Sequence, residues 1–217
     1  MSFNLEKEAL SASGIKARNL MVSYLNKLRF LRKQFINQTP AGKDPLITAK
    51  ELFKWLWKDR LTRYQSRGNF KLTKVIDSQL NPKAKSVGNC LGLTLLYNCL
   101  LRRMGIEAEA LYIENAFGIG PHVLTFLQIN DTASDIENSL PDGFDYQGHL
   151  NHPNRTRWGN KELVSEVYNS RGNLLFEKGE WKAALINYDR ALDIYGNYEK
   201  ARLNKLILLD KMRSMEK

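Results

Sequence analysis

An apolar segment over residues 90–103 constrains the fold of this chain more than any other part of it. Apolar side chains would lie on nearly every side of the helix that these residues form, so other elements must cover it all round. Gly105 stands where helices commonly end in a left-handed residue. We therefore expect a buried helix that ends near Arg103 and lies at the centre of a domain.

Three strands are predicted after this helix, over residues 108–113, 122–130 and 133–137. In the second strand His122 and Leu124 share one face, since alternate residues of a strand point the same way. The segment 115–121 contains two glycines and a proline. Such a segment suits a loop beside a site, and His122 follows it directly.

Helices are also predicted ahead of the apolar segment. Residues 16–37 show an amphipathic pattern, with leucines on one stripe and arginines and lysines on much of the rest. Thr48 suits the N-cap of a second helix, because Glu51 three residues later completes a capping box. A short helix follows over residues 72–79.

Cys90 begins the apolar helix, His122 begins a later strand, and carboxylates follow from Asp131 onward. A cysteine nucleophile needs such a set, because the thiolate is favoured by a helix N-terminus and by a nearby imidazolium. An acid then fixes the tautomer and the orientation of the imidazole. The spacing therefore predicts a cysteine-based catalytic site. Taken alone, Cys90 also fits a small buried apolar residue.

The second cysteine, Cys99, is expected in the core. It follows Cys90 by nine residues, which places the two on opposite faces of the helix and roughly 13 Å apart. That separation is too large for a disulfide. We expect a cytoplasmic protein, because the chain has neither an apolar run of about 18 residues nor a signal-peptide pattern.

The formal net charge of +10 is unevenly distributed over the 217 residues. Residues 90–150 carry 2 basic and 8 acidic side chains, whereas residues 61–89 carry 6 and 1. The predicted site thus lies in an acidic block, which would attract cationic substrate segments. No nucleic-acid motif accompanies the basic flanks, so we expect no nucleic-acid binding.

The pattern after residue 150 is helical. One unit of 34 residues, from Ser165 to Tyr198, has large and small residues at the positions of a tetratricopeptide repeat. These residues are Tyr168, Gly172, Leu175, Gly179, Trp181, Ala184, Tyr188 and Ala191. Gly196 departs from the pattern, which usually has proline there. A further helix over residues 199–213 would cap the repeat.

The order of cysteine, histidine and acid resembles that of the transglutaminase-like superfamily. Three short segments carry the resemblance, namely residues 88–92, 102–106 and 121–124. The combination with a tetratricopeptide unit is similar to bacterial transglutaminase-like proteins that carry such repeats. The resemblance implies a papain-like α+β fold, with the cysteine helix packed against an antiparallel sheet.

The resemblance also implies roles for individual residues. Cys90 would be the nucleophile, His122 the general base and acid, and Asp135 the orienting acid. Asp131 and Asn138 are the alternatives to Asp135. The backbone N–H of Cys90 would stabilise the oxyanion, and the second donor would be either Gln79 or Trp55.

We predict four parts: a helical extension (1–44), a transglutaminase-like domain (45–150), a linker (151–164) and a repeat with its capping helix (165–217). The predicted function is cysteine-dependent acyl transfer on a protein or peptide, without a cofactor or a metal, with a protein partner at the repeat. One alternative is an inactive scaffold for protein–protein interaction. Another is a zinc site formed by Cys90, His122, His149 and His152, which the lack of paired cysteines disfavours.

Overall fold

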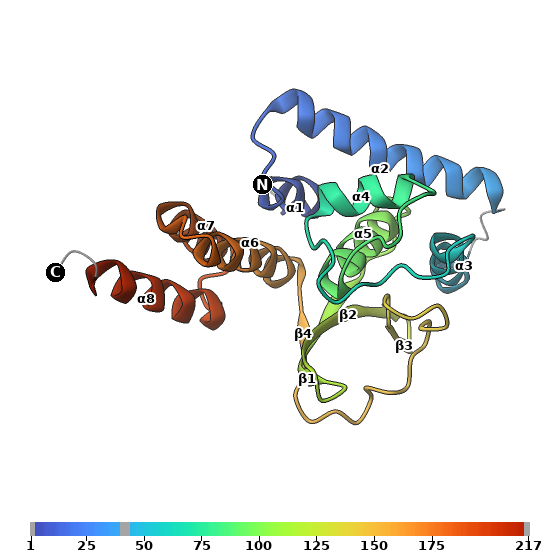
Figure 1. Ribbon diagram of the computed structural model, residues 1–217. Coiled ribbons are helices and arrows are strands. Elements are labelled where there is room, and N and C mark those ends of the chain that lie inside the picture. Colours follow the sequence, from blue (N-terminus) through green and yellow to red (C-terminus); the bar gives the residue numbers. More distant parts are fainter. Residues whose placement is uncertain (1–2, 40–43, 215–217) are drawn as a thin grey trace. The chain divides into compact units, whose positions relative to one another are not determined.

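The computed structural model describes residues 3–39 and 44–214 (Figure 1). Within these ranges the chain forms eight helices and one four-stranded antiparallel sheet, which confirms the predicted mixture of helix and sheet. None of the helices in the described part of the chain is long and apolar enough to cross a membrane.

The described residues belong to two compact units. The first contains Met1–Ile15 and Gly159–Lys217, and the second contains Lys16–Trp158. Residues 1–44, predicted as one extension, are therefore divided between the units. The predicted linker, 151–164, instead holds a strand and the start of a helix.

The second unit contains four helices and the sheet. Its helices are α2 (Arg18–Gln38), α3 (Pro45–Trp57), α4 (Leu72–Leu80) and α5 (Cys90–Arg102). Its strands are β1 (Glu109–Ala116), β2 (Gly120–Ile129), β3 (Thr132–Ile136) and β4 (Arg155–Trp158), in the order β3-β2-β1-β4. The sequence predicted the first three strands but not β4, whose four residues include two arginines.

Helix α5 is the buried centre of this unit, as its sequence predicts. All side chains from Leu91 to Leu101 are buried. The helix packs against β2, α4 and α2 (Figure 1). Gly105, with φ of 76°, follows its end, and the backbone N–H of Ile106 donates to the carbonyl of Leu101 at 3.0 Å.

Helix α3 begins one turn earlier than predicted. Its N-cap is Asp44 rather than Thr48, and the Asp44 carboxylate accepts from the backbone N–H groups of Leu46 at 2.7 Å and Ile47 at 3.0 Å. Pro45 occupies the first helical position, where its fixed φ favours a helix start. The Thr48 hydroxyl instead donates to the carbonyl of Asp44.

The other unit is helical. It contains α1 (Leu5–Ala12), α6 (Asn160–Glu177), α7 (Trp181–Ile194) and α8 (Glu199–Ser214). Helices α6 and α7 form an antiparallel pair, α8 packs on both, and α1 packs on α6. The sequence predicted the last three helices, although α6 begins at Asn160 rather than near Ser165.

Gly172 is where α6 and α7 approach closely. A Cβ atom at this position would collide with the ring of Tyr188, which is 2 % exposed. The Tyr188 hydroxyl donates to the Asn173 side chain at 2.9 Å, so the ring cannot turn away without losing this bond. Only a glycine therefore fits between these helices.

We expect Gly172→Ala to lower the free energy of unfolding. Overpacking costs about 1–3 kcal/mol, and the helix propensity of alanine recovers about 1 kcal/mol of this. Gly196→Ala is the matched control, because a Cβ there meets nothing closer than the Leu192 carbonyl at 3.8 Å. Urea denaturation of both variants measures the difference, and equal stabilities would contradict the packing argument.

Candidate functional site

Cys90 occupies the first position of α5 and is partly exposed, whereas Cys99 is buried within the helix. Both cysteines are free. The Asn89 side chain caps the helix by accepting from the backbone N–H of Gly92 at 3.1 Å. Cys90 therefore lies where unpaired backbone N–H groups and the helix dipole favour a negative charge.

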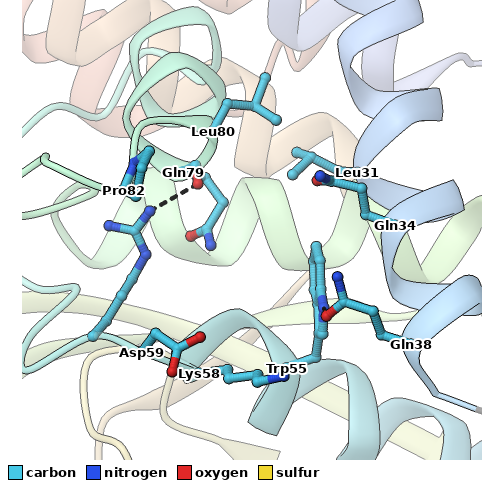
Figure 2. A pocket seen from close by; sticks show the side chains of 10 residues that line it. Leu31, Gln34, Gln38, Trp55, Lys58, Asp59, Gln79, Leu80 and Pro82 are labelled. Atoms are coloured by element: carbon cyan, nitrogen blue, oxygen red, sulfur yellow. Dashed lines mark hydrogen bonds between the residues drawn. The ribbon is translucent and has the colours of Figure 1, made fainter.

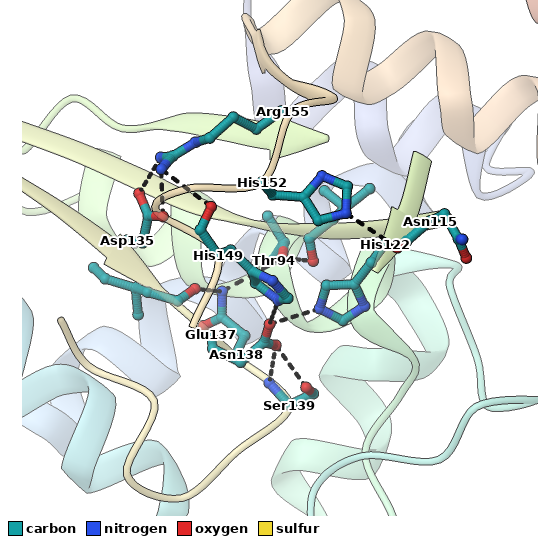
Figure 3. Close-up of polar contacts among 12 residues, drawn as sticks. Thr94, Asn115, His122, Asp135, Glu137, Asn138, Ser139, His149, His152 and Arg155 are labelled. Carbon is teal, nitrogen blue, oxygen red and sulfur yellow. Dashed lines mark hydrogen bonds and ion pairs between the residues drawn. The ribbon is translucent and has the colours of Figure 1, made fainter. Parts of the chain in front are cut away.

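His122 lies near the start of β2, opposite Ile113 of β1. Its side chain is 7 % exposed, and interactions with Cys90 and Glu137 raise its pKa. The Nε2 atom lies 2.7 Å from Oε2 of Glu137. The imidazole on β2 thus pairs with a carboxylate that follows β3 (Figure 3).

Glu137 directly follows β3 and is completely buried. Its Oε1 atom accepts from the backbone N–H of Ser139 at 3.0 Å and from the Ser139 hydroxyl at 2.5 Å. Its own backbone N–H donates to the carbonyl of Gly143 at 2.7 Å. One oxygen of the carboxylate is therefore anchored, and the other faces His122.

The surroundings of His122 and Glu137 stabilise the charged forms of both. Burial opposes the His122 imidazolium, but hydrogen bonds and negative charge from Cys90 and Glu137 outweigh burial and raise the pKa of His122 to about 10. Burial likewise opposes the Glu137 carboxylate, yet contacts with His122, His149 and Ser139 lower its pKa to about 2. The two groups form an ion pair at neutral pH.

Asp135, the predicted orienting acid, does not contact His122, and this expectation is corrected. Both of its oxygens accept from the Arg155 guanidinium at 2.9 Å (Figure 3). Arg155 belongs to β4, and it also donates to the carbonyls of His149 and Leu150. Asp135 therefore anchors the chain segment that carries His149.

Neither alternative acid contacts the imidazole. Asp131 is exposed in the turn between β2 and β3. Asn138 is buried, and its amide donates to the Thr125 hydroxyl at 2.9 Å, which itself donates to Asn98 at 2.7 Å. This side chain thus connects the end of β3 to β2 and α5.

The predicted side-chain donors for the oxyanion are engaged elsewhere. The Gln79 amide donates to the carbonyl of Leu56 at 3.2 Å, and the Trp55 indole donates to Gln38 at 3.0 Å. Gln79 and Trp55 line a separate pocket beside α2, α3 and α4 (Figure 2). The Cys90 backbone N–H is left as the donor from the predicted set.

His149 joins the site, although no catalytic role was predicted for it. Its Nε2 atom is buried and lies 3.6 Å from Oε2 of Glu137, beyond hydrogen-bonding distance. Its ring packs against Phe117 at 4.6 Å and Tyr146 at 5.1 Å between ring centroids. Phe117 lies in the predicted loop between β1 and β2, so this loop borders the site.

Three side chains of the site could together hold a metal ion. His122, Glu137 and His149 each offer one ligand atom, and these atoms lie within 4.8 Å of one another. His152, a member of the predicted zinc set, instead places its Nε2 atom 3.2 Å from the carbonyl of Asn115.

Comparison of the chain with known proteins gives no match: no family model, no curated protein and no solved structure is significantly similar to it.

Proposed function

We propose that this protein is a cysteine-dependent acyl-transfer enzyme in which Cys90 is the nucleophile, His122 carries the proton and Glu137 orients His122. The observation that carries this proposal is the position of the imidazole. It lies 2.7 Å from a buried carboxylate, and interaction with the thiol at the N-terminus of α5 contributes to its raised pKa. Base and orienting acid are thus in contact, and the nucleophile acts on the same imidazole, as the reaction requires.

The reaction follows from these contacts. The Cys90 thiolate attacks the acyl carbon, and the bond to the leaving amine breaks after the His122 imidazolium gives that amine its proton. A thioester remains on Cys90. Water then gives a proton to His122 and adds to the thioester, so the carboxylic acid leaves and the thiolate is restored beside the imidazolium. The Cys90 backbone N–H stabilises the oxyanion in both steps.

The resemblance to transglutaminase-like proteins supports the same reaction. A cysteine at the N-terminus of a buried helix and a histidine on an antiparallel sheet agree with that family's arrangement. A protein or peptide amide is the proposed substrate, and the helical unit, as a tetratricopeptide repeat, would bind a protein partner. We propose hydrolysis rather than transamidation, because Cys90 is partly exposed to water. The cytoplasm, which keeps thiols reduced, is the proposed location.

Trapping of the acyl intermediate tests this proposal. We expect p-nitrophenyl acetate to release nitrophenol in a burst and to leave one acetyl group on Cys90. Acid quenching followed by peptide mass spectrometry locates the adduct. The buried Cys99 is the internal control, and Cys90→Ala should give neither burst nor adduct.

Two outcomes would overturn the proposal. An equal burst from Cys90→Ala would show that another group attacks the ester. A folded wild-type protein without any adduct would favour an inactive scaffold, whose partner binding would be unaffected by Cys90→Ala.

A further inference from the structure

His149 has no role in the proposed reaction. Its Nε2 atom is buried, lacks a hydrogen-bond partner among the described residues and faces the Glu137 carboxylate at 3.6 Å (Figure 3). A buried nitrogen without a partner costs free energy. One ligand atom from each of His149, His122 and Glu137 lies within 4.8 Å of the other two.

We propose that His122, Glu137 and His149 form a binding site for one zinc ion, and that zinc bound there blocks the proton transfer of His122. The metal binding stands by itself, whereas the block rests on the proposed acyl transfer. Two imidazoles and one carboxylate are a ligand set that zinc accepts, with a fourth position open to water. Calcium and magnesium prefer oxygen ligands alone, so they fit this set less well.

The distances between the ligand atoms suit a tetrahedral zinc ion after a small movement of His122. Bonds of about 2.0–2.1 Å place two tetrahedral ligand atoms about 3.3 Å apart. The Nε2 atom of His149 lies 3.6 Å from the shared oxygen of Glu137, close to this value. The Nε2 atom of His122 lies at 2.7 Å, so it would move away by about half an ångström as the ion replaces the proton.

Other groups hold two of the ligands in orientation. Ser139 anchors the second oxygen of Glu137 with two hydrogen bonds, and Phe117 and Tyr146 pack on the ring of His149. Partners of this kind fix the direction of metal ligands and increase affinity. Cys90 is not part of this cluster of ligand atoms.

Zinc on Nε2 of His122 would stop the proposed catalysis for a chemical reason. A neutral imidazole bound through Nε2 carries its proton on Nδ1, so it has no lone pair left to accept another. The contact with Glu137 that stabilises the imidazolium would be lost as well. The thiol of Cys90 would keep its place but lose its proton acceptor.

The test is calorimetric titration of the untagged, full-length protein with zinc. We expect one ion per chain, and His149→Phe should weaken binding at least about 100-fold, because even indirect partners of metal ligands are worth 10–100-fold. Phenylalanine keeps the ring packing but removes the nitrogen. His152→Phe is the matched control and should bind like the wild type, as should Cys90→Ala.

Failure of the metal site and failure of the proposed function are distinguishable. Absence of saturable binding, or equal affinity of His149→Phe and the wild type, would overturn the site whether or not Cys90 is acylated. In the wild type, zinc should also abolish acylation of Cys90 and a chelator should restore it. Saturable binding with undiminished acylation would leave the site standing and overturn the block. If His149→Phe is unfolded by circular dichroism, His149→Gln replaces it, with the same loss expected.

Discussion

Glu137→Gln is expected to slow the acylation of Cys90 by up to about 10⁴-fold, the loss found when the acid of a comparable triad becomes an amide. The amide keeps the size of the side chain and an oxygen for Ser139. It has no charge to stabilise the imidazolium, although Glu137 is completely buried and lies 2.7 Å from Nε2 of His122. The burst rate with p-nitrophenyl acetate measures the loss.

The pH profile separates this role of Glu137 from a purely structural one. Because Glu137 contributes to the raised pKa of His122, the limb of the profile due to His122 should move to lower pH in Glu137→Gln. A variant that is merely less stable would give a smaller burst, but the His122 limb of its pH profile would stay at the same pH.

Asp135→Asn is the control, because it changes the acid two residues away. It breaks the paired hydrogen bonds with Arg155 at 2.9 Å and should cost about 1–3 kcal/mol of stability. Acylation by the folded protein should stay within a few-fold of the wild type. The reverse result, a large loss in Asp135→Asn and little in Glu137→Gln, would restore Asp135 as the orienting acid.

The second large effect concerns the rate at which iodoacetamide alkylates Cys90 at pH 6 in the presence of a chelator. An ordinary cysteine thiol, with a pKa of about 8.5, is ionised in only about one molecule in 300 at pH 6. The pKa of His122 is about 10, so the imidazole stays protonated from pH 6 to 9 and stabilises a thiolate beside it. We therefore expect iodoacetamide to alkylate Cys90 faster in the wild type than in a variant without this positive charge.

His122→Gln should remove this advantage. The amide can still donate to Glu137 but carries no charge to stabilise a thiolate, so alkylation of Cys90 at pH 6 should be slower than in the wild type. The groups that face His122 are Cys90 from α5 and Glu137 after β3, and Glu137 also has Ser139 and His149 beside it. Cys99 should stay unreactive in both proteins until they are denatured. Equal alkylation rates for wild type and variant at pH 6 would refute the pairing of Cys90 with His122.

Local patterns predicted much of the sheet-containing unit. The apolar run after Cys90 could only be a buried helix, because no other arrangement hides leucines on all sides, and α5 is that helix. Alternation of apolar residues predicted β1, β2 and β3 to within three residues at each end. The start of α3 was missed because the Asp44-Pro45 start competed with a plausible capping box at Thr48.

No local sequence pattern predicted strand β4 or the contacts that depend on it. Its four residues include two arginines, and its pairing partner β1 lies some forty residues earlier. Isolated pairs of this kind are stabilised by the neighbouring strand rather than by their own propensity. Without β4, nothing in the sequence places Arg155 on Asp135 or brings the segment of His149 to the site.

The sequence by itself determined that a thiol would begin a buried helix and that an imidazole would begin a strand, because both positions follow from periodicity along the chain. Which acid meets the imidazole was decided only by the tertiary structure. Asp135 and Glu137 are two residues apart, and strand alternation gives such residues the same face. Arg155 pairs with Asp135, and Ser139 directs Glu137 toward His122. A contact between strands that are distant in the chain therefore determines which acid meets the imidazole, and local sequence could not predict that contact.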